Sequence, residues 1–152
     1  KITIGLNPFH YGGGGITSTL NDYLKILKFL LNSIKLDTRR SFVPQIFRNQ
    51  IGNLGIPSLK SFNKGLTSDY DICENVAKSW GYGLMINNKP IAGKRSAGSG
   101  SWAGVLNTYF WVDSKNDIAG LFLTQILPCY TPTLLNAFET FEKLAYKRLK
   151  RS

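Results

Sequence analysis

The chain has 152 residues, of which 43% are hydrophobic and 12% aromatic, and its 19 basic and 9 acidic residues give a net charge of +10. This length and composition predict one globular domain and exclude a disordered basic tail, which would be poor in aromatic residues. No apolar run reaches the roughly 20 residues that a membrane-spanning helix needs, so no membrane span is predicted.

The N-terminal third of the chain predicts helices. After the glycine run Gly12–Gly15, residues 18–32 carry leucines at steps of four, three and four, which is typical of an amphipathic helix. These leucines are Leu20, Leu24, Leu27 and Leu31. Ser18 is the predicted N-cap. A second, shorter helix is predicted over residues 41–50, with Ser41 as its cap, and residues 52–70 are predicted to form a loop.

The second half predicts an antiparallel sheet. Residues 81–86 form a short candidate strand, and residues 108–112 and 118–124 form two stronger ones joined by a hairpin loop. Both stronger strands are apolar at successive positions, which is typical of a sheet covered on both faces.

A closing helix is predicted over residues 132–150, with Thr131 as its N-cap and Pro132 at its first position. The face that it offers to the sheet consists of Leu134, Phe138, Phe141 and Ala145. The sequence offers no second cover of similar quality, so one sheet face is predicted to stay exposed and to favour association.

Half of the net charge lies in the last ten residues, which contain no acid. The five cations are Lys143, Lys147, Arg148, Lys150 and Arg151. Because a helix macrodipole favours cations at its C-terminal end, we interpret them as a solvated helix end, and binding of nucleic acid is not expected.

The soft metal ligands of the chain are too few for a metal cluster. They are two cysteines, Cys73 and Cys129, and a single histidine, His10, so no metal and no cofactor is predicted. We interpret the cysteines as buried, reduced thiols, which favours an intracellular compartment. His10 is interpreted as a turn residue, because the chain lacks the Gly-x-Ser-x-Gly elbow that usually accompanies a Ser-His-Asp triad.

Two further motifs invite a catalytic interpretation. The glycine run is not followed by Lys-Ser or Lys-Thr, so it predicts a tight turn and no phosphate loop. Ser61 and Lys64 match Ser-x-x-Lys, in which a lysine amine one helical turn away takes the proton of a serine. With 12 serines and 13 lysines, about one such pair is expected at random, and we interpret this one as chance.

The stretch from Gly98 to Gly104 has two open interpretations. Backbone N–H groups on the edge of a strand could polarise a carbonyl in a binding cleft, or the stretch could be a loop before a hairpin.

Four blocks of the sequence carry a family resemblance. They are Gly12–Tyr23, Gly81–Leu84, Trp102–Gly104 with Thr108–Asp113, and Phe122–Gln125. In this order they resemble the C-terminal part of the beta-lactamase-related serine hydrolases, which include class C beta-lactamases, beta-lactamase-like esterases and fungal acyltransferases. The resemblance implies an α+β fold in which helices flank an antiparallel sheet, with the first strands and a helical domain supplied by upstream sequence.

The resemblance also implies acyl transfer from a small ester or amide. In the family, a serine of Ser-x-x-Lys attacks the substrate, a lysine and a tyrosine move protons, and a third motif lines the site. Trp102-Ala103-Gly104 resembles the Trp-x-Gly form of this third motif, and Val105 would offer its N–H to the oxyanion. This form lacks the cation that could hold a beta-lactam carboxylate, so an esterase is implied more than a beta-lactamase. Asn107 departs from the small residues of the family.

The nucleophile of the family has no counterpart in this chain. The family's Ser-x-x-Lys precedes the glycine run, whereas Ser61 follows it, and Tyr-x-Asn is absent. We therefore expect residues 1–152 to be a single unit, the C-terminal portion of such a domain without its nucleophile-bearing part, and to be inactive alone. The alternative is a non-catalytic remnant or scaffold whose basic tail binds an anionic partner.

Overall fold

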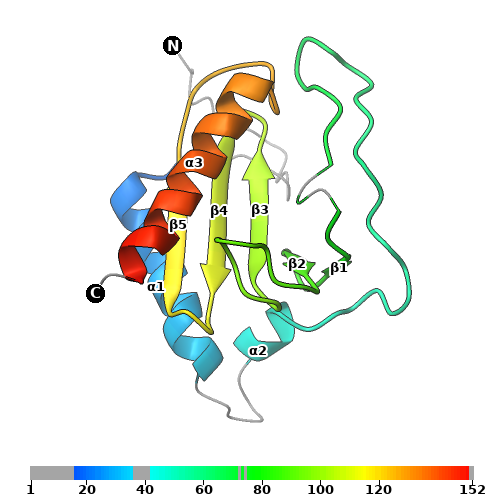
Figure 1. Cartoon of the computed structure of the whole chain (residues 1–152). Helices are drawn as coiled ribbons and strands as arrows, with labels where there is room; N and C mark the ends of the chain where they lie inside the picture. Colours follow the sequence, from blue (N-terminus) through cyan, green and yellow to red (C-terminus); the bar gives the residue numbers. More distant parts are fainter. Residues whose placement is uncertain (1–15, 36–41, 72, 74, 151–152) are drawn as a thin grey trace.

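The structure is a computed structural model that describes residues 16–35, 42–71, 73 and 75–150. Its elements in chain order are α1 (Leu20–Lys35), α2 (Val43–Ile46), β1 (Lys78–Trp80), β2 (Met85–Asn87), β3 (Gly100–Gly104), β4 (Thr108–Asp113), β5 (Ile118–Phe122) and α3 (Pro132–Leu149). The strands form one antiparallel sheet in the order β1-β2-β3-β4-β5 (Figure 1). The predicted α+β class, with an antiparallel sheet and flanking helices, is confirmed.

Helices cover both faces of the sheet at β4 and β5, with α3 in front and α1 behind (Figure 1). Successive residues of a strand point to opposite faces, so alternate residues of β4 pack against α1 and against α3. Val112 packs against Leu27 and Leu31 of α1, whereas Trp111 packs against Phe138 of α3. The prediction of an uncovered sheet face is therefore wrong here, because the leucine stripe of α1 supplies the second cover.

A glycine makes room for the largest side chain of the core. Trp111 is fully buried and lies opposite Gly120 of β5. A Cβ atom at position 120 would lie 1.9 Å from the indole ring of Trp111, so any other residue there would have to displace the ring.

The N-terminal helices differ from the prediction at their ends. The cap of α1 is Thr19 and not Ser18: the Asp22 N–H donates to Thr19 Oγ1 at 3.2 Å, and the threonine hydroxyl donates to the Asp22 carboxylate at 2.9 Å. The second helix, α2, has only four residues and no side-chain cap. Its predicted cap, Ser41, lies outside the described residues.

The predicted loop over residues 52–70 contains no helix or strand, only two isolated bridges. The strand expected over residues 81–86 begins later, at Met85, because Gly81 and Leu84 close a turn through a backbone hydrogen bond of 2.8 Å. That turn joins β2 to β1. The sequence did not predict β1, which is only three residues long.

The buried stripe of α3 differs from the predicted face. It consists of Phe138, Glu142 and Tyr146, whereas Phe141 is 39% exposed. The helix buries a glutamate because the guanidinium of Arg95 meets it, with Nε–Oε1 and Nη2–Oε2 distances of 2.5 and 3.1 Å. Hydropathy alone could not place a charged residue at the centre of this face.

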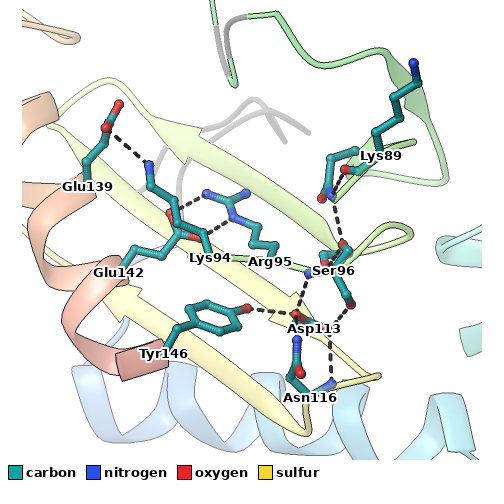
Figure 2. A network of polar contacts seen from close by, with 11 residues as sticks. Lys89, Lys94, Arg95, Ser96, Asp113, Asn116, Glu139, Glu142 and Tyr146 are labelled. Atoms are coloured by element: carbon teal, nitrogen blue, oxygen red, sulfur yellow. Dashed lines mark hydrogen bonds and ion pairs between the residues drawn. The ribbon is translucent and has the colours of Figure 1, made fainter. Parts of the chain in front are cut away.

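A second polar centre joins three segments beside Tyr146 of α3 (Figure 2). The Asp113 carboxylate at the end of β4 accepts hydrogen bonds from the backbone and hydroxyl of Ser96, from the hairpin residues Lys115 and Asn116, and from the Tyr146 hydroxyl of α3. This network fixes the connection between β2 and β3, and thereby positions β3.

Candidate functional site

The segment Trp102–Val105 runs from the end of β3 into the turn before β4. Strand β2 pairs with β3 only at Gly100 and Ser101. From Trp102 onward, β3 has a strand partner on one side only, β4, among the residues that the structure describes. Such a strand edge carries backbone donors and acceptors that can pair with a ligand.

A three-residue turn follows Gly104. The Asn107 N–H donates to the Gly104 carbonyl at 3.0 Å, and Asn107 has a φ of 58°, whereas Val105 and Leu106 have no positive φ. This is a type I turn closed by a left-handed residue, a common way to join two strands by three residues. Asparagine tolerates that conformation, so the departure at Asn107 is compatible with the hairpin.

Val105 occupies the second position of the type I turn Gly104–Asn107, and its side chain points outward. The residue is 51% exposed, and its N–H finds no acceptor within the described part of the chain. The N–H predicted for the oxyanion is therefore free to donate to a ligand.

The indole of Trp102 lies on the sheet face that α1 covers. Trp102 is opposite Phe110, which packs into the cluster formed with α1. The indole meets Trp80 of β1 edge to face, with ring centroids 4.5 Å apart. Trp80 was not among the predicted site residues.

Thr108 is a second residue that the sequence reasoning missed. It lies opposite Gly104, and a Cβ atom at position 104 would come within 2.3 Å of its hydroxyl oxygen. The Thr108 hydroxyl therefore occupies the space beside Gly104, on the same face as Trp102. Pairing the two strands across a three-residue turn places Gly104 opposite Thr108, so this contact could have been predicted from the sequence.

The structure does not arrange Ser61 and Lys64 on a helical turn. Both lie in the loop before β1. The Lys64 ammonium contacts the Asp69 carboxylate at 2.5 Å, and the Ser61 N–H donates to the same carboxylate at 2.9 Å. The Lys64 ammonium, assisted by Ser61 and Lys60, lowers the pKa of Asp69. That this pair is a chance match stays a prediction.

The remaining candidates from the sequence are His10, the glycine run and the two cysteines. His10 and the glycine run lie outside the described residues. Cys73 and Cys129 form no disulfide; Cys129 is buried and Cys73 is half-buried, and burial raises the pKa of both thiols. Within the described ranges, no three His, Cys, Asp or Glu side chains gather as a metal site would need. No helix there is long and apolar enough to cross a membrane.

Comparison with known proteins gives one family match and several relatives. The family model described as Beta-lactamase matches residues 2–137. Two Mycobacterium tuberculosis sequences, "Uncharacterized protein MT1414" of strain CDC 1551 / Oshkosh and "Protein Rv1367c" of strain ATCC 25618 / H37Rv, are each 27% identical to this chain over 131 residues. The aligned part is 79% of this chain and 30% of each relative.

Among solved structures, the fold resembles simvastatin synthase (LovD) from Aspergillus terreus. The unliganded selenomethionyl form superposes with a TM-score of 0.72 at 20% identity, over 95% of this chain and 37% of that one. The LovD9 mutant gives a TM-score of 0.72 at 21% identity, over 93% and 37%. This chain thus spans about a third of the length of the proteins that it resembles.

Proposed function

The chain belongs to the beta-lactamase family, and on that premise we propose that residues 1–152 are the C-terminal part of a serine hydrolase or acyltransferase, acting on esters more readily than on beta-lactams. In this proposal the chain supplies the third active-site motif, and the attacking serine comes from sequence outside it. The four sequence blocks and the family match support the same assignment.

The observation that carries the proposal is the N–H of Val105 at the open end of β3, which has no acceptor among the residues that the structure describes. In acyl transfer, the serine oxygen bonds to the substrate carbonyl carbon, and the carbonyl oxygen takes up negative charge until the leaving alkoxide departs with a proton. A preorganised backbone N–H that donates to that oxygen lowers the barrier. Trp102 and Thr108 would line the same face of the strand.

The preference for esters is supported by the side chains that flank this N–H. Trp102, Ala103 and Gly104 bring no cation to the end of the strand, and the Thr108 hydroxyl stands beside Gly104. A carboxylate-bearing beta-lactam would find no charged partner on these residues, whereas an uncharged ester needs none.

Two assays test the proposal. Residues 1–152 alone should hydrolyse neither p-nitrophenyl butyrate nor nitrocefin above the buffer rate, and Ser61→Ala should change nothing. The chain extended at its N-terminus by the coding sequence that precedes Lys1 should contain Ser-x-x-Lys and Tyr-x-Asn, and should hydrolyse the butyrate ester faster than nitrocefin. Turnover by residues 1–152 that Ser61→Ala abolishes would refute it.

In the extended chain, Val105→Pro isolates the role of the N–H. Proline suits the second position of a type I turn, so the variant should fold while lacking the donor. Loss of one oxyanion donor costs about 10²–10³ in kcat. Val105→Ala keeps the N–H and should retain most of the activity. Equal activity of the two variants would exclude Val105 from the reaction.

A further inference from the structure

A cavity of about 200 Å³ lies between β3 and α3, and its lining includes Trp102 and Ala103 of the site proposed above. Ser101 and Ala103 of β3 line it, and both lie opposite residues that pack towards α3, namely Trp111 and Tyr109. The indole of Trp102 points to the other face of the same strand. The cavity therefore borders the candidate site at Trp102 and Ala103, but it lies on the face of β3 opposite the Trp102 indole.

The cavity lining combines aromatic and polar residues. The rings of Tyr109 and Phe138, stacked with centroids 4.6 Å apart, form an aromatic wall. Arg95 and Ser101 are two of the cavity's polar lining residues, and the Arg95 guanidinium lies 6.0 Å from the centroid of the Phe138 ring.

Both polar residues keep a hydrogen-bonding atom free at the cavity. Nε and Nη2 of Arg95 donate to Glu142, and Nη1 has no partner among the described residues. Nη1 is the guanidinium nitrogen without a dashed line in Figure 2. The hydroxyl of Ser101 also lacks a hydrogen-bond partner in the described part of the chain. Each residue is only 4% exposed. Buried donors without acceptors are costly, so two of them at one cavity indicate a place for an acceptor oxygen.

The charges around the cavity are balanced. Arg95 is paired with Glu142, and Lys94 with Glu139 at 3.2 Å. A carboxylate ligand would meet two glutamates and no unpaired cation, whereas a neutral carbonyl oxygen would accept hydrogen bonds without bringing a charge into a buried site. Cavities of about 150 Å³ admit benzene, so this one has room for a single substituted ring.

We propose that the cavity between β3 and α3 binds a small uncharged aromatic compound through its carbonyl oxygen. The oxygen accepts hydrogen bonds from Arg95 Nη1 and Ser101 Oγ, and the ring packs against Tyr109 and Phe138. The proposal concerns residues 1–152 alone and does not depend on the acyl-transfer chemistry.

The test is a titration of the chain with benzamide, followed by NMR chemical shifts or calorimetry, with benzoate as the charged counterpart. Benzamide should bind the unaltered chain, and benzoate should bind at least about tenfold more weakly because of Glu139 and Glu142. Ser101→Ala removes one donor and should weaken benzamide binding roughly 3–10-fold. Ser58→Ala, a change at an exposed loop serine, should have no effect.

Two more variants separate the cavity from the rest of the surface. Ala103→Leu places a larger side chain in the cavity and should abolish binding; Arg95→Lys keeps the pair with Glu142 but removes Nη1, and should weaken binding about tenfold. Circular dichroism checks that each variant is folded. If Ala103→Leu does not fold, Ser101→Ala alone tests the binding site. Absence of benzamide binding, or equal binding by Ser101→Ala, would overturn the proposal, and tighter binding of benzoate would overturn the choice of an uncharged ligand.

Discussion

Asn107 ties the turn after β3 to the segment that leads into α3. Its side chain is fully buried and uses its full set of partners: Nδ2 donates to the carbonyls of Ile126 and Pro128 at 2.8 and 2.9 Å, and Oδ1 accepts from the Tyr109 hydroxyl and the Tyr130 N–H at 2.7 and 2.8 Å. The residue that departs from the family pattern is thus the one that fixes the shape of the candidate site.

Asn107→Ala should lower the free energy of unfolding by about 2–4 kcal/mol, because it leaves several buried polar groups unpaired and puts a Cβ residue at a positive φ. Asn107→Gly suits the backbone but also loses the hydrogen bonds, so its loss should approach that of alanine. Urea unfolding followed by tryptophan fluorescence measures both. Asn53→Ala, at an exposed loop position, is the control and should stay within about 0.5 kcal/mol; a similar result for Asn107→Ala would refute the structural role.

Asp113 should make the stability of the chain sensitive to acid. Burial opposes its ionisation, but the hydrogen bonds from Ser96, Asn116 and Tyr146 outweigh that effect and lower its pKa. A lowered folded-state pKa contributes stability above the unfolded value of about 3.9, and that contribution is lost as the pH falls through the folded value. Unfolding free energies measured between pH 7 and 2 should fall at the acid end.

The Asp113→Asn variant tests this assignment, because its NH2 group would meet hydrogen-bond donors where a carboxylate oxygen now accepts. It should be less stable than the unaltered chain at pH 7 by about 2–4 kcal/mol, and its stability should fall less on acidification. A variant whose acid profile parallels that of the unaltered chain would show that other carboxylates carry the effect. Asp117→Asn, at an exposed hairpin position whose positive φ asparagine tolerates, is the control.

At the scale of elements, sequence pattern predicted the long helices and the two strongest strands, because each of them has a local signal. The leucine spacing of α1, the Thr131-Pro132 start of α3 and the β-rich runs of β4 and β5 depend only on neighbouring residues. The buried stripe of α3 was misjudged, since Glu142 becomes a core residue only through Arg95, 47 positions away. Strand β1 is short and exists through its pairing with β2.

The Arg95–Glu142 pair should behave as a buried unit. Glu142→Leu leaves a buried guanidinium without its partner and should cost about 3–5 kcal/mol, whereas the double variant Arg95→Met with Glu142→Leu should recover most of that loss. Chemical unfolding of the single and double variants gives the coupling energy. Lys143→Met, which breaks an exposed contact of 3.9 Å with Glu139, should cost at most about 1 kcal/mol. Additive losses would mean that the pair is not coupled.

At the scale of the whole molecule, the family and the place of the third motif could be inferred from the order of four sequence blocks. What could not be inferred were the packing partners of the sheet. The sequence pattern predicted an open sheet face, but α1 and α3 both pack on β4 and β5. The surface that remains for association is therefore the outer side of α1 and the second edge of β5, which pairs only with β4 within the described chain.

The isolated chain should associate through this surface. Ile26 and Phe29 are 52% and 60% exposed on the outer side of α1, and an open apolar strand edge favours pairing with another chain. Sedimentation should show species whose mass grows with concentration, together with ANS fluorescence. The double variant Ile26→Lys and Phe29→Glu should shift the chain towards monomer, whereas Lys28→Glu changes the charge of the same helix without removing apolar surface and should not. A chain that stays monomeric, melts cooperatively and does not bind ANS would contradict this prediction, and would mean that α1 and α3 suffice to complete the core.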